Sequence, residues 1–457
     1  MIRLLGALAT AAAATLSVHA PWLGDDVEDP RDRASTVAAA QDVRALLTAA
    51  RGAPPVLCAL AARSVGNYGW NDRAGAPVTP LGDALSARDE DMTRLSDADV
   101  EQLLTGLADA DGCVRELSAR LLGAQRGERV VAPLVQRLGA GDAALRAAAA
   151  FSLGLAHPRT AVDPLVRTLR DATTDVRANA AWALGRIEDG RSLAPLVAMV
   201  RDPQPVVREA AVVAIGHLDS TSAATTLIGV LRRDEAASVR RVAAWALGQL
   251  EATDAGAALA EALEKDADAR VREMSAWALG EIETRTASAA LMRALRDDES
   301  DAVREMAAWA LGETEDRTAT IALGTAAAGD RSARVRGTAA WALGQLDGRA
   351  APAGLLRALR DSSEDVRLKA AWALGQIGDA AAVPVLREAL ERETGGTRTR
   401  SAIVRALMKS GERSEQTMTA LLASKDPQVR EAAVRGLAGR DAFGPWPWPQ
   451  PRPRPFP

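Results

Sequence analysis

The chain has 457 residues and a formal net charge of −4. This mildly acidic balance argues against a nucleic-acid partner, because such a partner requires a basic surface. Outside the N-terminal region there is no run of roughly 18 apolar residues, so we predict no membrane span in the body of the protein. One compact core does not normally extend over this length, so several domains or a repeated architecture are expected.

The N-terminal segment has the features of an export signal. Residues 1–20 contain one basic side chain, Arg3, then an Ala- and Leu-rich stretch and the small-residue end Val18-His19-Ala20. This order resembles a secretory signal peptide with its cleavage point, and we therefore expect an exported, periplasmic protein. The alternative is a plain N-terminal helix or a wrongly assigned start, and then a cytoplasmic protein. Residues 21–34 are predicted to be a polar linker.

Residues 35–100 are predicted to form an atypical helical cap in front of a more regular array. Helices are expected up to about Ala50 and again around Cys58, and residues 96–99 resemble a capping box. Cys58 and Cys113 both lie in apolar helical contexts. Two cysteines do not define a disulfide framework, so we interpret them as buried thiols.

The sequence AWALG recurs along most of the chain. Its unchanged copies span residues 181–185, 244–248, 276–280, 308–312, 340–344 and 371–375. Looser copies end at Gly123, Gly154 and Gly216, and the closing glycines are 31 or 32 residues apart throughout. Self-similarity at such a period is typical of stacked supersecondary units.

Each unit is predicted to contain a first helix (helix A), a polar turn, a second helix (helix B) and a glycine stop. An Asp begins each turn, and an Arg follows six residues later, early in helix B. We interpret the two as an ion pair that ties each turn to its own helix. The pairs are Asp171/Arg177, Asp202/Arg208, Asp234/Arg240, Asp266/Arg272, Asp298/Arg304, Asp330/Arg336 and Asp361/Arg367.

The Trp of AWALG is out of phase with the core positions on a helical wheel. In one copy, Val303, Ala307 and Leu311 form the core side, and Trp309 lies roughly opposite to them. Stacked repeats would align the indoles on one shared face, which is normally concave and used for binding. The alternative is that the indoles lean on neighbouring helices and only close that surface. The candidate binding residues are Trp182, Trp245, Trp277, Trp309, Trp341 and Trp372.

Acidic residues flank the indoles in the middle of the array. Trp277 and Trp309 each have a Glu four residues before and four residues after them, a spacing that places all of these side chains on one helix face. We therefore predict that the centre of the groove is acidic. The carboxylates are Glu273, Glu281, Glu305 and Glu313.

The Asp-x(5)-Arg turn followed by AAxALG resembles the short HEAT-like repeats named after the phycobilin lyases. The resemblance covers about residues 101–440. It implies an all-α protein, a right-handed α-solenoid of about ten two-helix repeats, in which the variable position of AAxALG faces the concave side. The family name alone also implies an accessory enzyme of the bilin-lyase type, acting on a protein-bound prosthetic group.

Residues 441–457 are a tail rich in Pro, Trp and Arg. Alternating prolines forbid a helix and favour an extended polyproline II segment; a tail without fixed structure is the alternative. Such segments dock on aromatic-lined grooves, so the tail is one candidate occupant of this protein's own groove. Its candidate contact residues are Trp446, Trp448, Arg452 and Arg454.

We find no catalytic motif, and we predict neither a metal site nor a cofactor. His157 and His217 do not complete the His-Glu metal pairs of the HEAT-like deoxyhypusine hydroxylases. The predicted function is a non-enzymatic scaffold that binds a protein or peptide in the Trp-lined groove, with the bilin-lyase type of accessory enzyme as the alternative. The oligomeric state is left open.

Overall fold

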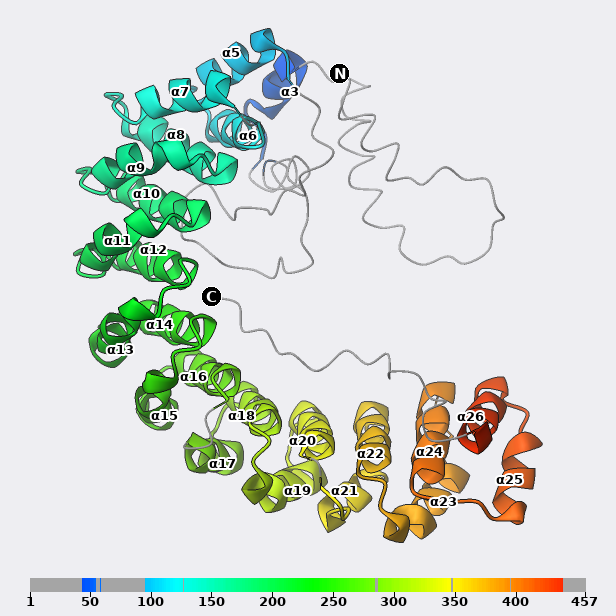
Figure 1. Ribbon diagram of the computed structural model, residues 1–457. Helices are drawn as coiled ribbons and strands as arrows, with labels where there is room; N and C mark the ends of the chain where they lie inside the picture. Colours follow the sequence, from blue (N-terminus) through cyan, green and yellow to red (C-terminus); the bar gives the residue numbers. More distant parts are fainter. Residues whose placement is uncertain are drawn as a thin grey trace. The chain divides into compact units, whose positions relative to one another are not determined.

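The structure is a computed structural model that describes residues 43–54, 58, 95–125, 127–283, 287–346, 348–394 and 396–438 (Figure 1). The described residues form α-helices and short 3₁₀ helices, without a strand. They divide into two compact units, with the boundary after Ala223. Each unit is a stack of two-helix repeats, which confirms the predicted all-α solenoid architecture.

The first unit begins with one helix, α3, and continues with four helix pairs, α5/α6 to α11/α12. In each pair the first member is helix A and the second is helix B. Their bounds are α3 Val43–Ala50, α5 Asp97–Gly106, α6 Gly112–Gly123, α7 Glu128–Arg137, α8 Ala143–Ala156, α9 Val162–Thr168, α10 Thr174–Ile187, α11 Leu193–Met199 and α12 Pro205–Gly216.

The second unit contains seven further pairs, α13/α14 to α25/α26, so the described residues hold slightly more repeats than the ten or so expected. Their bounds are α13 Ala224–Arg233, α14 Ala237–Gln249, α15 Gly256–Lys265, α16 Ala269–Glu281, α17 Ser288–Asp297, α18 Asp301–Glu313, α19 Thr320–Gly329, α20 Ala333–Gln345, α21 Ala353–Ala358, α22 Glu364–Ile377, α23 Val383–Arg392, α24 Thr397–Lys409, α25 Glu415–Leu422 and α26 Pro427–Ala438.

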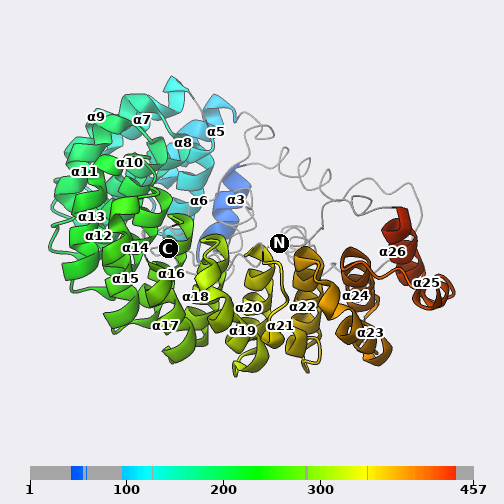
Figure 2. The same ribbon diagram turned by 60° about the horizontal axis from the view of Figure 1, so that its bottom comes forward.

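The helices B carry most of the packing between repeats. Within the second unit, α14, α16, α18, α20, α22 and α24 each pack against the next helix B (Figures 1 and 2). In α18 the predicted core residues Val303, Ala307 and Leu311 are fully buried. Alanine and glycine on the flanks of helix B allow neighbouring backbones to approach closely, which is why so alanine-rich a helix can form an interior.

The recurring Arg and acidic residues form a row of ion pairs between neighbouring repeats, which we call the ladder. Arg304 Nε and Nη2 donate to the Asp330 carboxylate of the following repeat at 2.8 and 3.1 Å. Arg304 Nη1 donates to the backbone oxygen of Asp298, in its own turn, at 2.9 Å. Equivalent bidentate pairs are Arg146–Asp171, Arg177–Asp202, Arg240–Asp266, Arg272–Asp298, Arg336–Asp361 and Arg367–Glu393.

The ladder corrects the predicted ion pair within each turn. The Arg does hold its own turn, but through carbonyl oxygens, whereas the carboxylate of that turn binds the Arg of the preceding repeat. The Arg therefore does contact the turn six residues before it, but the carboxylate that it pairs with lies 25 or 26 residues after it. The hydrogen bond from Arg146 lowers the pKa of Asp171. Such a carboxylate stabilises the fold above its unfolded pKa, and this contribution is lost as pH falls through the lowered pKa.

The N-terminal part of the first unit is fastened to its first repeat. Helix α3 packs against α5 and α6. Cys58 forms a disulfide with Cys113 at the start of α6, which corrects our interpretation of the two residues as separate thiols. Two cysteines do not establish a pairing by themselves, because the chain path between Cys58 and α6 is not visible in the sequence. The predicted capping box is confirmed, with the backbone N of Asp99 donating to Ser96 Oγ at 3.1 Å.

No helix within the described ranges combines the length and the hydropathy needed to cross a bilayer. The segments predicted as signal peptide, residues 1–20, and as polar linker, residues 21–34, lie outside the described residues. The same holds for residues 439–457, which include the predicted tail.

We predict that Arg304→Gln destabilises the second unit by roughly 2–3 kcal/mol, because it leaves the buried Asp330 carboxylate without its bidentate partner. Urea unfolding together with hydrogen exchange of α18 and α20 measures the loss. Arg296→Gln is the matched control, since Arg296 pairs with Asp297 on the exposed surface, where such pairs contribute about 0.5 kcal/mol or less. Equal losses in both variants would contradict the ladder's role.

We predict that breaking the Cys58–Cys113 disulfide loosens the attachment of α3. The bond closes a loop of 55 residues, for which the chain-entropy account gives about 4 kcal/mol of stabilisation. Reductant should lower the unfolding midpoint and expose α3 to proteolysis. In the double variant Cys58→Ser with Cys113→Ser, reductant should have no further effect. Two free thiols in the unreduced, denatured chain would refute the bond.

Candidate binding face

The helices B of the second unit present one shared face, which we call the helix B face and define by α14, α16, α18, α20 and α22. In α18 the side chains that remain partly exposed lie at Asp301, Ala302, Glu305 and Glu313. Apart from Ala302 they are four or eight residues apart, so they follow one side of the helix, and Trp309 lies on that side between Glu305 and Glu313. The helical phase predicted for Trp309 is therefore correct.

The central indoles are buried. Trp245, Trp277, Trp309 and Trp341 are only 2–8% exposed, and Trp182 and Trp372 are half-buried. The four central indoles therefore do not form an exposed aromatic row along a groove, and the prediction that they are available to a ligand is wrong for these residues. The alternative stated from the sequence, that the indoles lean on neighbouring helices, describes them correctly.

The physical reason lies in the glycine that closes each AWALG unit. A Cβ atom placed on Gly280 would lie 2.6 Å from Cζ3 of Trp309, and one placed on Gly312 would lie 2.9 Å from Cζ3 of Trp341. Each indole thus reaches back over the preceding helix B and fills the space that the missing side chain leaves. The same contact joins Gly154 to Trp182, Gly248 to Trp277 and Gly344 to Trp372.

The equivalent positions in the first unit also stack between repeats. The rings of Phe151 and Trp182 lie 5.1 Å apart with an interplanar angle of 25°. The guanidinium carbon of Arg120 lies 5.6 Å from the centre of the Phe151 ring, within the range of a cation–π interaction. Arg120, Phe151 and Trp182 thus form a row across successive repeats, and in this row the position of the tryptophans is used for packing.

Two carboxylates remain within the helix B face, between the buried indoles and solvent. Glu273 and Glu305 are half-buried in successive repeats. Burial raises the pKa of Glu273, and the negative charge of Glu305 raises it further. Burial likewise raises the pKa of Glu305, while Arg334, whose Nε lies 3.5 Å from its carboxylate, opposes the shift. The face therefore holds incompletely neutralised negative charge at reduced solvent exposure.

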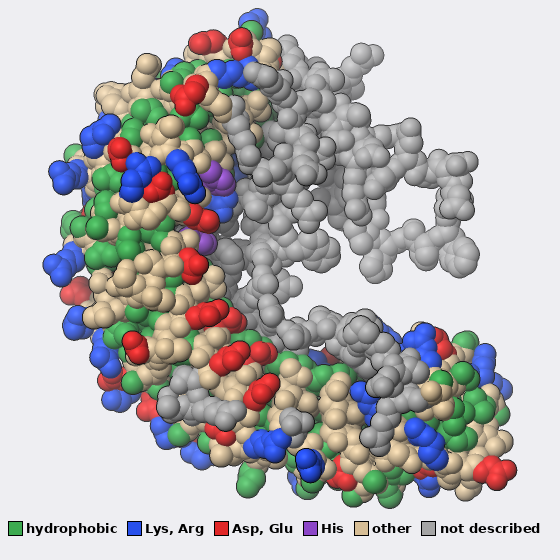
Figure 3. Space-filling view, in the orientation of Figure 1, with side chains coloured by type: hydrophobic (Ala, Val, Ile, Leu, Met, Phe, Trp, Pro, Cys, Tyr) green, Lys and Arg blue, Asp and Glu red, His purple; other side chains and the backbone are tan. Residues whose placement is uncertain are grey.

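A second set of carboxylates follows the C-terminal ends of the helices B. The predicted residues Glu281 and Glu313 lie there, the first exposed and the second half-buried. Beside them are Glu251, Glu283 and Glu315, which the sequence analysis did not single out. Figure 3 shows acidic side chains following one another along this edge from α14 to α18. A signal was available in the sequence, because each of the three lies three residues after a closing glycine.

The backbone at these three positions is unusual. Glu251, Glu283 and Glu315 have φ angles of 47°, 47° and 49°, a left-handed conformation that costs a residue with a side chain about 1–2 kcal/mol. Glycine occupies the equivalent position at Gly378. A carboxylate at a helix C-terminus is also disfavoured by the helix dipole. Five successive repeats, with Glu188 and Asp219 before these three, thus carry acidic residues where folding alone favours glycine.

The tail residues Trp446, Trp448, Arg452 and Arg454 lie outside the described residues. Among the residues that the structure does describe, no group of three or more His, Cys, Asp or Glu side chains is placed to hold a metal ion.

Comparison with known proteins identifies the repeat. A family model described as HEAT repeats matches the chain in eight overlapping segments that run from residue 131 to residue 438. These segments are 131–216, 162–248, 193–280, 224–312, 256–344, 289–364, 320–408 and 352–438. A search of curated protein sequences gave no match.

Solved structures show the same architecture. Yeast importin-beta (Kap95p) aligns with a TM-score of 0.51 at 16% identity, covering 91% of this chain and 63% of that one. The importin chain of the Kap95:Nup1 complex aligns with a TM-score of 0.53 at 12% identity, covering 89% and 62%. The CpcE–CpcF complex of phycocyanin lyase from Nostoc aligns with a TM-score of 0.34 at 20% identity, covering 61% and 93%. At 12–16% identity the likeness to the two importin chains concerns the fold alone.

We predict that Gly280→Ala destabilises the second unit by roughly 1–3 kcal/mol, because the new methyl group overlaps the Trp309 ring and forces repacking. Gly329→Ala is the control, since a Cβ there meets no atom within 4 Å and alanine favours a helix. Thermal unfolding monitored by Trp fluorescence measures both. Similar stabilities for the two variants would contradict the glycine–indole contact.

Proposed function

The chain belongs to the HEAT-repeat proteins, and we propose that it is a non-enzymatic interaction scaffold whose helix B face in the second unit binds an extended basic peptide. The observation that carries the proposal is the acidic character of this face. Glu273 and Glu305 lie on it with raised pKa values, and the exposed carboxylates of Glu251, Glu283 and Glu315 follow one of its edges in consecutive repeats.

Burial of the indoles changes the expected mode of recognition. The rings of Trp277 and Trp309 pack between repeats, so a ligand on this face contacts mainly the carboxylates. Only the edges of the buried rings are left for further contacts. The indole Nε1 of Trp309 is buried without a hydrogen-bond partner among the described residues. A peptide carbonyl that displaced the side chains above it would supply an acceptor, because buried N–H groups are normally paired.

Repeated carboxylates suit a partner with positive charges at intervals. Bringing a cation to Glu273 or Glu305 replaces lost hydration with an ion pair, which lowers the raised pKa and favours binding. The Pro-rich tail, residues 441–457, has this character, since it carries Arg452 and Arg454 in a segment that loses little conformational entropy on docking. We propose the tail as one occupant, in competition with basic peptides of other proteins.

An exported location belongs to the same proposal. The N-terminal segment resembles a signal peptide, and a disulfide such as Cys58–Cys113 persists in oxidising compartments. Both features support a periplasmic or extracellular scaffold.

The bilin-lyase alternative predicts a different property. An accessory enzyme of that type would hold a chromophore, and its complex would absorb visible light. No described residue favours this chemistry over peptide binding, and an absorbance spectrum after incubation with a bilin tests it directly.

We predict that a labelled peptide of residues 441–457 binds a chain ending at residue 440, as measured by fluorescence anisotropy. The double variant Glu273→Gln with Glu305→Gln should weaken binding roughly fivefold to tenfold through two lost ion pairs. Added salt should reduce the difference between the variant and the unmodified chain. Glu235→Gln with Glu299→Gln removes the same charge from exposed turns and should bind like the unmodified chain. Equal affinity for both double variants would end the proposal.

Stability provides an internal check on the same variant. Because the pKa values of Glu273 and Glu305 are raised in the folded state, their stabilising contribution is present at acid pH and is lost as pH rises through the raised pKa. The glutamine variant should therefore unfold at a higher temperature than the unmodified chain at neutral pH and at a similar temperature at acid pH. Weaker binding by a more stable protein cannot be attributed to unfolding.

A further inference from the structure

The Arg–carboxylate ladder is interrupted near the end of the second unit. In each rung, the Arg is early in helix B and the carboxylate belongs to the turn of the next repeat. Arg367 continues this pattern with Glu393 at 2.7 and 2.9 Å. Arg400, the fourth residue of α24, is the next Arg in the series, just as Arg304 is the fourth residue of α18.

The residue that should supply the next carboxylate is Ser424. Its backbone oxygen accepts from Arg430 Nη1 six residues later, as the oxygen of Asp298 accepts from Arg304. Its Oγ accepts from the backbone N of Asp426 at 3.2 Å, the role that Asp330 Oδ1 has toward Ser332. Serine thus replaces the turn function of the aspartate but has no second oxygen for the preceding Arg.

The consequence is an Arg without its usual acceptor. Arg400 is half-buried, and its Nε has neither solvent exposure nor a hydrogen-bond partner among the described residues. In six of the other rungs, Arg146, Arg177, Arg240, Arg272, Arg304 and Arg336, the same atom donates to an aspartate.

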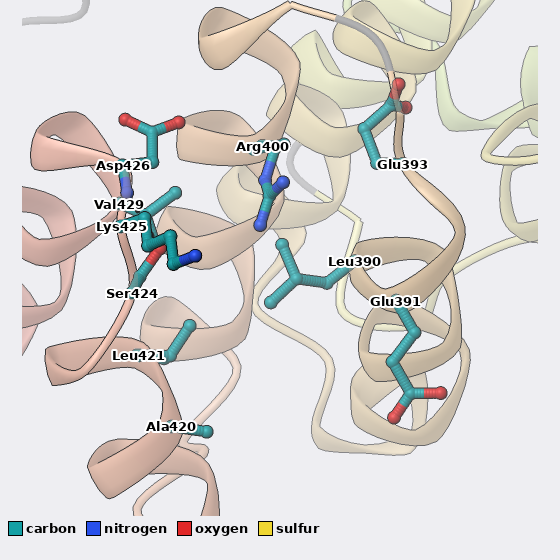
Figure 4. Close-up of a pocket in the computed structure, with 10 residues that line it drawn as sticks. All are labelled: Leu390, Glu391, Glu393, Arg400, Ala420, Leu421, Ser424, Lys425, Asp426 and Val429. Atoms are coloured by element: carbon teal, nitrogen blue, oxygen red, sulfur yellow. Dashed lines mark hydrogen bonds between the residues drawn. The ribbon is translucent and has the colours of Figure 1, made fainter.

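A cavity of about 530 Å³ opens at this break, between α23/α24 and α25/α26. Figure 4 shows the Arg400 guanidinium and the Lys425 amino group extending into the space between the two helix pairs, with Leu390 and Leu421 at its walls. The cavity therefore combines two cationic groups with an apolar lining.

The acidic residues around the cavity do not supply the missing acceptor. Glu393 is held by both Nε and Nη2 of Arg367. Asp426 accepts from the backbone N of Gln428 at 2.9 Å, at the start of α26. Glu391 is exposed, and Figure 4 shows its carboxylate directed away from Arg400.

We propose that this cavity is a binding site for a carboxylate borne on a small apolar group, and that the ligand's two oxygens take the place of the absent rung. A guanidinium binds a carboxylate through two parallel hydrogen bonds, and Lys425 adds a second positive charge. Leu390, Leu421 and Val429 contact the apolar part of the ligand. A peptide end with an aliphatic side chain has this chemistry. The site is separate from the helix B face and does not rest on its proposed role.

The probe is N-acetyl-leucine, with N-acetyl-leucinamide as its neutral counterpart, added to the full chain at millimolar concentration. The acid should raise the thermal unfolding midpoint and bind in a calorimetric titration, and the amide should do neither. Arg400→Gln should weaken binding of the acid roughly tenfold to hundredfold, because it removes the charge-assisted pair. Arg357→Gln, an exposed Arg of α21, should leave the affinity unchanged.

A second variant fills the site from within. Ser424→Asp restores the carboxylate that the preceding rungs of the second unit have, so it should raise the unfolding midpoint without ligand and abolish the response to N-acetyl-leucine. Arg400→Gln should fold normally, because no described acidic partner is lost. The proposal is overturned if the acid gives no response, if acid and amide act alike, or if Ser424→Asp still responds.

Discussion

The bidentate contact between an Arg of one repeat and a carboxylate of the next is the constraint on which the architecture depends. It fixes the distance and rotation between neighbouring helices B, because the guanidinium is planar and both of its ends are used. One edge binds the carboxylate of the following turn, and Nη1 binds the carbonyls of its own turn, as in Arg304. A solenoid has no long-range core to correct local errors, so each interface must specify its own geometry.

A second contact, between a closing glycine and an indole, joins the same helices near their C-terminal ends. The ladder holds the turns at the N-terminal end of helix B, whereas Trp309 fills the gap over Gly280 near its C-terminal end. Two contacts at opposite ends of a helix prevent both sliding and pivoting. Alanine fills much of the space that remains between neighbouring helices B, beside recurring core residues such as Val303 and Leu311.

The fold could be predicted from the sequence because its signals are local and repeated. The period, the glycine stops and the helical phase of Trp309 each follow from spacing within one unit. The exposure of that Trp could not be predicted in the same way, since it depends on Gly280 in the preceding repeat. The predicted ion-pair partner of Arg304 was wrong for the same reason. A spacing of six residues suggested a pair with Asp298 in the same turn, whereas the structure pairs Arg304 with Asp330, 26 positions away. The Cys58–Cys113 bond likewise joins residues 55 positions apart, a pairing that no local spacing indicates.

Residues that stacking does not require therefore carry more functional information than residues that it does require. The positions that serve stacking explain stability and say little about a ligand. Glu251, Glu283 and Glu315 lie where a left-handed backbone favours glycine and where a helix end disfavours negative charge. Ser424 interrupts a ladder whose preceding rungs in the second unit, from Arg240 to Arg367, each have a carboxylate. In each case charges of one sign gather without a described counter-ion: the carboxylates of Glu251, Glu283 and Glu315 on the helix B face, and Arg400 with Lys425 at the cavity. That combination is expected where a partner of opposite charge supplies the missing interaction.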